Sequence, residues 1–319
     1  MERREFFKIG AGAVALVGQP ALFGGEKPQK FKIGMAATTW LTATPTTATY
    51  WNATEAIASL NIGASEADNS EARLDSTYGD KVGDFLSRSR KVGVYLTGVY
   101  QALQLHNPQM LSEMQSKVRS VASFLKAVGA AYIALGWDTP PPMGGKPYQR
   151  TPEDVRRAIH ASDEFGRLSL EEFGIPIAFH AERDIPKQMV LQILDDTNPK
   201  YVRLCADVGH LTAMGLDALQ VVKKYASRLT ASHWKDFDPK VPGPDYLGLK
   251  ARGDFVEVGK GIVDFRGLAD FYRDVNFDGW VMLELDRTRE ASILASAREM
   301  KAFVTEQLGL QFYPPSVAS

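Results

Sequence analysis

Hydrophobic positions gather into eight short, nearly continuous runs that alternate with longer amphipathic segments from residue 31 onward. In chain order the runs are FKIGMAA, NIGAS, VYLTGVY, YIALG, IPIAFHAE, VRLCAD, LTASHWKD and WVMLELD. Runs with so little polar alternation are typical of strands covered on both faces, as in a parallel sheet whose crossovers are helices. The pattern therefore predicts eight successive strand and helix units.

The segments between the runs carry helix signals. Residues 151–174 begin with Thr151 as an N-cap, Pro152 at the first helical position and acidic residues in the first turn, and residues 107–130 end near a glycine. Eight units in about 290 residues predict a (β/α)8 TIM barrel. An open doubly wound sheet is less consistent with the sequence, because no Gly-rich phosphate-binding turn follows the first predicted strand.

One long connection, residues 237–263, follows the seventh strand and is rich in Pro and Gly. The loops at the carboxyl ends of barrel strands build the active site. We therefore expect this connection to form a lid or a wall over the substrate.

Composition and charge fit a soluble globular protein. The chain has 319 residues, 45% hydrophobic content and a formal net charge of -1. With no Lys/Arg block beyond the N-terminus, neither a nucleic acid nor a membrane surface is an expected partner, whereas an oligomer is possible. The single Cys205 excludes an intramolecular disulfide and a multi-cysteine metal site, and is expected to be a small buried hydrophobe.

The N-terminus indicates a compartment. RREFFK, residues 3–8, resembles the twin-arginine export motif, and an apolar run of roughly a dozen residues follows, too short to span a bilayer. We expect residues 1–27 to be a signal peptide, residues 28–319 to form the barrel, and the mature protein to be periplasmic or secreted. The alternative is an amphipathic first helix of the fold.

Polar side chains recur where the last four predicted strands end, which is where barrel active sites lie. They are His180 and Glu182, Asp207 and His210, His233, Lys235 and Asp236, and Glu284 and Asp286. Alternation places one polar set on one face of each strand. Buried imidazoles and carboxylates cost several kcal/mol each unless they are paired or bind an ion. The pattern therefore favours one divalent metal ion, which could be Mn, Co, Zn, Mg or Fe.

Five segments in this region resemble, in order and spacing, the xylose isomerase-like barrel superfamily. They are FHAERD, CADVGHLTAMGLD, YASRLTASHWKDFD, FVEVGKGIVDF and DGWVMLELD, which together span about residues 175–286. That superfamily includes sugar isomerases and epimerases, inosose dehydratases and enzymes that cleave keto-glycosides.

The resemblance implies that Asp207, His233 and Glu284 are metal ligands and that the fourth ligand comes from the end of strand five. Epimerases of the superfamily have a glutamate there, which also acts as acid and base. This chain has His180, with Glu182 two residues on, which is more like the His-x-His of the dehydratase branch. We therefore expect His180 as fourth ligand and Glu182 as the base, with Glu284 also catalytic.

His210 matches a residue of the superfamily that contacts the sugar, so substrate binding and catalysis are its expected roles. Four further residues are candidates for substrate contact from their positions at strand ends or on the long loop: Glu66, Trp137, Lys235 and Arg252.

Structural alternatives stay open for several of these residues. Asp207 could be a helix N-cap, His233 a core histidine and Glu284 an ion-pair partner, and Lys235 could pair with Asp236.

The resemblance implies a metal-dependent isomerase or epimerase that removes a proton next to a metal-chelated carbonyl of a sugar or keto-sugar. Because the N-terminal motif indicates export and no basic cluster is present for a phosphate, we expect the enzyme to be exported and its substrate to be neutral. The alternative is a dehydratase or lyase acting on inososes or keto-glycosides by β-elimination. Less favoured are a nuclease of the abasic-site endonuclease type, against which the near-zero charge argues, and a sugar-binding barrel without catalysis.

Overall fold

The computed structural model describes residues 27–40, 47–139, 148–243, 245–246, 249–250 and 253–316. The expected signal segment, apart from Lys27, and Arg252 lie outside these ranges. No helix among the described residues combines the length and the apolar character that crossing a membrane requires.

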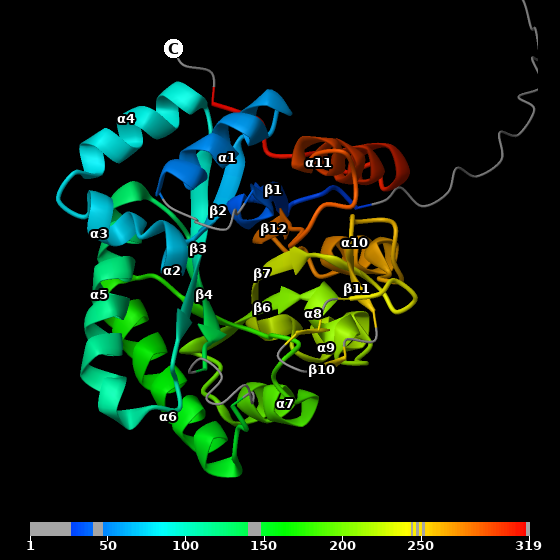
Figure 1. Cartoon of the computed structure of the whole chain (residues 1–319). Coiled ribbons are helices and arrows are strands. Elements are labelled where there is room, and N and C mark those ends of the chain that lie inside the picture. Colours follow the sequence, from blue (N-terminus) through cyan, green and yellow to red (C-terminus); the bar gives the residue numbers. More distant parts are fainter. Residues whose placement is uncertain are drawn as a thin grey trace, which may run out of the picture.

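Eight parallel strands close into a barrel in the order β1-β12-β7-β6-β5-β4-β3-β2 (Figure 1). Their bounds are Lys32–Ala36 (β1), Ala64–Asp68 (β2), Tyr95–Leu103 (β3), Tyr132–Trp137 (β4), Ile177–His180 (β5), Val202–Asp207 (β6), Leu229–Trp234 (β7) and Trp280–Leu283 (β12). The predicted (β/α)8 TIM barrel is confirmed.

Helices follow the strands and form the outer layer (Figure 1). The α-helices are Thr47–Ser59 (α1), Asn69–Ala72 (α2), Leu74–Tyr78 (α3), Val82–Val92 (α4), Leu111–Val128 (α5), Pro152–Leu168 (α6), Lys187–Asp196 (α7), Val208–Ala213 (α8), Ala218–Lys224 (α9), Phe265–Asp274 (α10) and Ile293–Ala302 (α11). Short 3-10 turns are Ala37–Trp40 (η1), Pro108–Met110 (η2) and Ala226–Arg228 (η4), and π-helical turns are Ser169–Phe173 (η3) and Phe303–Gln307 (η5).

Local signals explain the helix ends. The predicted N-cap Thr151 and Asp154 form a reciprocal capping box ahead of Pro152, and α5 ends at Gly129 in the left-handed conformation, φ 78°. Both features satisfy backbone groups that a helix terminus leaves unpaired.

The second strand differs from its prediction. NIGAS, residues 61–65, was expected, but β2 runs over Ala64–Asp68. Asn61 has a φ of 58°, which belongs to the turn after α1 rather than to a strand. The apolar run places this strand three residues too early, because Glu66 and Asp68 lie within it.

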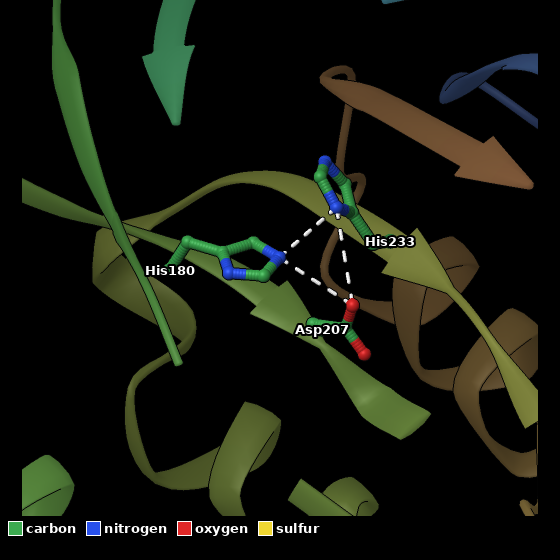
Figure 2. A group of neighbouring side chains, drawn as sticks. All are labelled: His180, Asp207 and His233. Carbon is green, nitrogen blue, oxygen red and sulfur yellow. Dashed lines mark hydrogen bonds and ion pairs between the residues drawn. The ribbon is translucent and has the colours of Figure 1, made fainter. Parts of the chain in front are cut away.

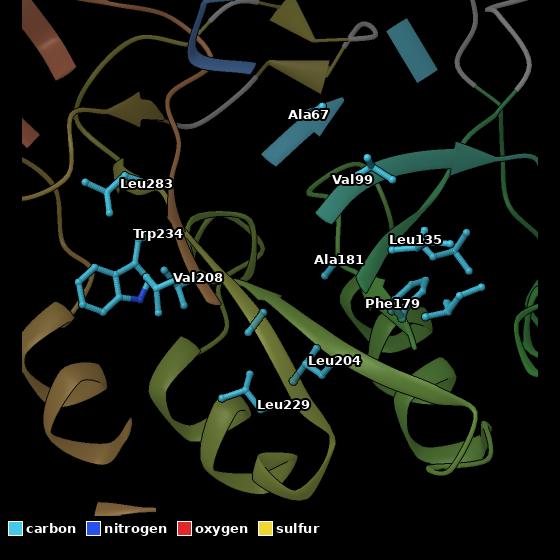
Figure 3. Packing of buried hydrophobic residues seen from close by; sticks show 14 of the residues in the cluster. Ala67, Val99, Leu135, Phe179, Ala181, Leu204, Val208, Leu229, Trp234 and Leu283 are labelled. Atoms are coloured by element: carbon cyan, nitrogen blue, oxygen red, sulfur yellow. The ribbon is translucent and has the colours of Figure 1, made fainter. Parts of the chain in front are cut away.

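Alternate residues of each strand face two different layers. The inward layer is made of small side chains such as Ala134, Ala178 and Ala231, together with the larger Tyr132 and Met282. The outward layer packs against the helices, as Figure 3 shows for Val99, Leu135, Phe179, Leu204 and Trp234. This parity decides which side chains reach the barrel interior.

Beyond β7, Asp236–Asp238 (β8) pairs antiparallel with Asp254–Val256 (β11), and Asp245–Tyr246 (β9) pairs with Leu249–Lys250 (β10). The carboxylate of Asp236 anchors this connection. Its two oxygens accept backbone N–H groups of Phe237, Gly259, Gly261 and Val263 at 2.7–3.1 Å. Asp236 is thus committed to the loop and does not pair with Lys235.

Candidate functional site

Three ligand-type side chains meet at the carboxyl ends of adjacent barrel strands. His180 ends β5, Asp207 ends β6 and His233 lies on β7, each two residues beyond a small inward residue of its strand. Because all three share the inward parity, they point toward one another (Figure 2). All three are buried, and this is a group of the kind that holds a metal ion.

The distances within this group are short. Nε2 of His180 lies 3.1 Å from Nδ1 of His233 and 3.4 Å from Oδ2 of Asp207, and Nδ1 of His233 lies 4.0 Å from the same Oδ2. Two atoms that each bind one ion at about 2.1 Å stand about 3.0–3.4 Å apart for octahedral or tetrahedral angles. Two of the three distances lie in this range and the third, 4.0 Å, exceeds it, so the three atoms would hold one divalent ion after a small closing of His233 toward Asp207.

The two carboxylate oxygens of Asp207 have different hydrogen-bonding environments. Oδ1 caps α8 by accepting the N–H of His210 at 2.8 Å, which realises the structural alternative for this residue. Oδ2 is buried and accepts no hydrogen bond, although Lys235 lies 3.6 Å away. A buried oxygen without a hydrogen bond is costly, and an ion shared with the two imidazoles would satisfy it. The donor set thus fits the metal that the sequence indicates.

A carboxylate lies next to the Nε2 side of the His233 imidazole, on the side opposite the three-residue group. Its Nε2 lies 3.0 Å from Oε1 of Glu66, and Tyr132 donates a short hydrogen bond to Oε2 of Glu66. An imidazole that donates from Nε2 presents its Nδ1 lone pair, which is the atom that faces Asp207 and His180. Glu66, expected to contact substrate, therefore also orients a candidate ligand.

A second carboxylate lies next to the Nδ1 side of the His180 imidazole. Nδ1 of His180 lies 2.9 Å from Oε1 of Glu182, as an ion pair that is not aligned as a hydrogen bond, and Tyr100 donates to the same oxygen at 3.0 Å. Burial alone would raise the pKa of Glu182, but His210 and His180 outweigh it and lower this pKa to about 2. Glu182 is thus an ionised carboxylate held by its neighbours.

The proton on His180 competes with a metal. Burial alone would lower the pKa of His180, but Glu182 and Asp207 outweigh it and raise this pKa to about 10. A ligand imidazole must lose a proton, so metal binding here releases one.

His210 lines the site from the first turn of α8. Its Nδ1 accepts the backbone N–H of Arg183 at 2.8 Å, and its Nε2 lies 3.2 Å from Oε2 of Glu182. With Nδ1 engaged as an acceptor, the proton of the neutral ring is on Nε2, where it can serve Glu182 or a bound hydroxyl. The phenyl ring of Phe255, on the long connection, packs against His210 with ring centroids 4.8 Å apart. The described part of this connection supports His210 but contributes no residue to the cavity lining, so a lid or wall over the substrate stays a prediction.

Glu284 lies beside the three-residue group. Oε2 is 2.9 Å from Nδ1 of His233, and Oε1 is 2.9 Å from Nζ of Lys235. Burial alone would raise the pKa of Glu284, but Lys235 and His233 hold it well below its ordinary value. Lys235 also donates to Asp286 at 2.8 Å, so this lysine is paired with two carboxylates that follow β12.

These side chains line a cavity of about 260 Å3, which corresponds to about nine water molecules at roughly 30 Å3 each. Its lining is mostly polar or charged and includes Glu66, His180, Glu182, His210, His233, Lys235 and Glu284 from the sequence candidates. Residues that the sequence did not single out also contribute: Thr38, Asp68, Tyr100, Arg183 and Asp184. Asp68 could have been found from strand parity, because it follows Glu66 by two positions.

Trp137 is not brought to the cavity. It has the outward parity of Ile133 and Leu135 and packs in the layer between strands and helices, where its indole N–H donates to His106 at 3.1 Å. Strand alternation turns its side chain away from the described cavity, so substrate contact by this residue stays a prediction that the geometry does not support. Arg252 lies outside the described residues.

Comparison with known proteins finds relatives that are similar to this chain in sequence or in fold. An inosose dehydratase of Clostridium perfringens is 26% identical over 272 residues, which cover 76% of this chain and 89% of that protein. A xylose isomerase-like TIM barrel protein of Mycobacterium smegmatis, solved in complex with magnesium, gives a TM-score of 0.69 at 11% identity, over 88% of this chain and 97% of that one.

A D-allulose 3-epimerase of a Methylomonas species, solved with D-allulose, gives a TM-score of 0.64 at 14% identity, over 88% of this chain and 98% of that one. At such identities the two structural similarities show the fold alone. The resemblance seen in the sequence is confirmed at the level of the family: the model of the xylose isomerase-like TIM barrel matches residues 55–303, and the chain belongs to that family.

Proposed function

We propose that the protein is a divalent-metal-dependent enzyme that removes a proton next to the carbonyl of a neutral sugar or keto-sugar. The observation that carries this proposal is the buried group of His180, Asp207 and His233 on the wall of a polar cavity large enough for one sugar ring. The relatives named above include enzymes acting on such molecules, an inosose dehydratase and a D-allulose epimerase.

The three residues of this group would hold the ion, with Glu284 adjacent as the fourth candidate. A bound ion supplies Lewis acidity, which polarises a carbonyl and acidifies the neighbouring C–H bond. The chain's own residues then have defined tasks. Glu66 and Glu182 orient the two imidazoles, while Lys235 and His210 present N–H groups at the cavity wall for substrate oxygens.

The charge of the cavity supports a neutral substrate. Its described lining has six carboxylates, which are Glu66, Asp68, Glu182, Asp184, Glu284 and Asp286. Against these stand two permanently cationic side chains, Arg183 and Lys235. The GKG turn at residues 259–261 offers no phosphate site either, because the amides of Gly259 and Gly261 bind Asp236. Even with a divalent ion bound, the six carboxylates outnumber the positive charges of the lining, so a phosphorylated sugar would meet net repulsion.

Return of the proton to the substrate gives isomerisation or epimerisation, which is the first candidate reaction. Dehydration by loss of a β-oxygen is the second candidate. It is favoured by the similarity to an inosose dehydratase that spans 76% of this chain.

Metal analysis and turnover test this proposal. Purified protein should carry about one divalent ion per chain, and it should convert at least one member of a panel of ketohexoses, inososes and 3-keto-glucosides with Mn, Co, Zn or Mg added. NMR of the products separates an epimer from a dehydrated product. His233→Ala should lose both metal and turnover, whereas His160→Ala, on the exposed face of α6, should lose neither.

Other outcomes contradict the proposal. Sugar binding without turnover would indicate a non-catalytic barrel, cleavage of an abasic DNA duplex would indicate a nuclease, and turnover of phosphorylated sugars alone would exclude a neutral substrate.

We also propose that twin-arginine export delivers the protein to the periplasm or the medium, on the strength of RREFFK and the apolar run after it. A reporter that requires folded export, fused after residue 30, should leave the cytoplasm. Arg3→Lys combined with Arg4→Lys should hold it inside, and unchanged secretion of the double variant would remove this motif from consideration.

A further inference from the structure

One carboxylate of the cavity differs from the others in its partners. Five of the six carboxylates that line the cavity contact a lysine, an arginine or an imidazole: Glu66 (His233), Glu182 (His180 and His210), Asp184 (Arg150), Glu284 (Lys235 and His233) and Asp286 (Lys235). Asp68 has no such partner among the described residues. Its Oδ1 accepts the backbone N–H of Ser70 at 2.9 Å, which makes it the N-cap of α2.

Asp68 is placed to reach a bound substrate. It is the last residue of β2 and follows Glu66 by two positions, so it shares the inward parity and lies one step further toward the cavity mouth. Its side chain is half-buried, whereas that of Glu66 is buried. The titratable groups that act on it electrostatically include Glu71 on α2, Glu284 after β12 and Tyr100 on β3.

These surroundings favour a carboxyl group that changes its protonation near neutral pH. Burial raises the pKa of Asp68, Glu71 and Glu284 raise it further, and the backbone N–H groups of Glu71 and Ser70 oppose them only in part, so the pKa is about 7. A proton-transfer group works best when its pKa lies near the working pH. Glu182, with a pKa of about 2, is a much weaker base.

We propose that Asp68 is the catalytic residue that exchanges a proton with the substrate, an inference that rests on the function proposed above. The carboxylate of Asp68 takes the proton from the carbon next to the substrate carbonyl, and the electron pair of that C–H bond remains on the carbon and its carbonyl. The Asp68 carboxylic acid then returns the proton to carbon, or gives it to a departing β-oxygen as the double bond forms. In both cases the carboxylate is restored.

A conservative variant separates this role from helix capping. Asn is as good an N-cap as Asp but cannot accept a proton from carbon, so Asp68→Asn should keep the cap of α2 and lose the chemistry. A matched control is Asp217→Asn, because Asp217 is an exposed aspartate that caps α9 through the N–H of Gln220 at 3.1 Å and lies outside the cavity lining.

The experiment uses full-length, metal-loaded protein with D-allulose and an inosose as probes, and follows exchange of the substrate α-proton with D2O by NMR. For Asp68→Asn we expect a rate about 10²- to 10⁴-fold lower, with unchanged metal content and melting temperature. The wild-type rate should fall as pH decreases through about 7, and this limb should vanish in Asp68→Asn while Asp217→Asn retains it.

Exchange by Asp68→Asn at the wild-type rate, with the pH limb intact, would overturn the inference while leaving the proposed function standing. If the wild-type protein exchanges neither probe nor any sugar of the wider panel, the proposed function fails instead. A 13C-carboxyl NMR titration of wild type and Asp68→Asn then still decides the state of Asp68. Absence of a carboxyl that titrates near pH 7 and is missing in the variant would overturn the inference independently.

Discussion

Two buried aspartates, one between the outer helices and one in the barrel, show how differently this molecule treats a buried charge. Asp75, on α3, accepts hydrogen bonds from Asn69 at 3.0 Å, from Lys117 at 2.9 Å and from Ser120 at 2.6 Å, so that both oxygens are satisfied. Asp207 has one capped oxygen and one buried oxygen without a hydrogen bond.

The difference between the hydrogen bonding of these two aspartates indicates which of them belongs to a candidate functional site. A satisfied buried carboxylate stabilises the fold by fixing α3 to α5, and it needs nothing further. The Oδ2 atom of Asp207 accepts no hydrogen bond and faces two imidazoles and the ammonium of Lys235, which is an arrangement that a bound ion would complete. Each aspartate can therefore be used as the control for the other.

The largest effect is expected for Asp207→Asn. The amide oxygen can still cap α8, but the ligand charge is lost, so affinity for Mn, Zn or Co should fall by more than about 100-fold and turnover should collapse. Titration calorimetry on metal-stripped protein measures this. Asp75→Asn should bind metal like wild type, and weaker binding there would erase the distinction between the two sites.

Glu182→Gln should have the next largest effect and decides between two roles of this residue. If Glu182 mainly orients His180, its amide variant should bind metal about 10- to 100-fold more weakly, and Glu66→Gln should behave alike through His233. If Glu182 is the base that the sequence suggests, the variant should keep the metal and lose turnover. Unchanged metal affinity would thus reject the orienting role.

Asp75→Asn should lower the free energy of unfolding by about 1–3 kcal/mol, because Lys117 and Ser120 lose their anionic acceptor in a buried setting. Urea denaturation followed by circular dichroism measures this, and turnover per folded molecule should stay at the wild-type value. A stability equal to wild type would show that this cluster contributes little.

The smallest expected effect is that the contribution of Asp75 to the free energy of unfolding depends on pH. Burial alone would raise the pKa of Asp75, but Ser120, Asn69 and Lys117 outweigh it and lower this pKa below its ordinary value. A carboxyl with a lowered pKa in the folded state stabilises the fold above its unfolded pKa of about 3.9 and loses that stabilisation as pH falls through the folded value. The stability difference between wild type and Asp75→Asn should hold at pH 5–7 and shrink below about pH 4, and a constant difference would contradict it.

Much of the barrel could be predicted because its strands are apolar runs of the expected length. The exception is β2, where Glu66 and Asp68 interrupt the apolar pattern because they serve the cavity. The site followed from the same logic where parity was applied, as for His180, Asp207 and His233. Trp137, whose position at a strand end was considered without its parity, lies instead in the layer between the strands and the helices.

The sequence by itself determined the barrel, the residue types of the candidate metal site and their order along the chain, because periodicity and strand-end position are local properties. Only the tertiary structure decided the partners. Contacts across the closed barrel place Glu66 of β2 next to His233 of β7. They also place Glu182 against Tyr100 and two imidazoles, and they leave Asp68 without a cationic partner among the described residues. Distances between side chains far apart in sequence are fixed by barrel closure, and no local pattern encodes them.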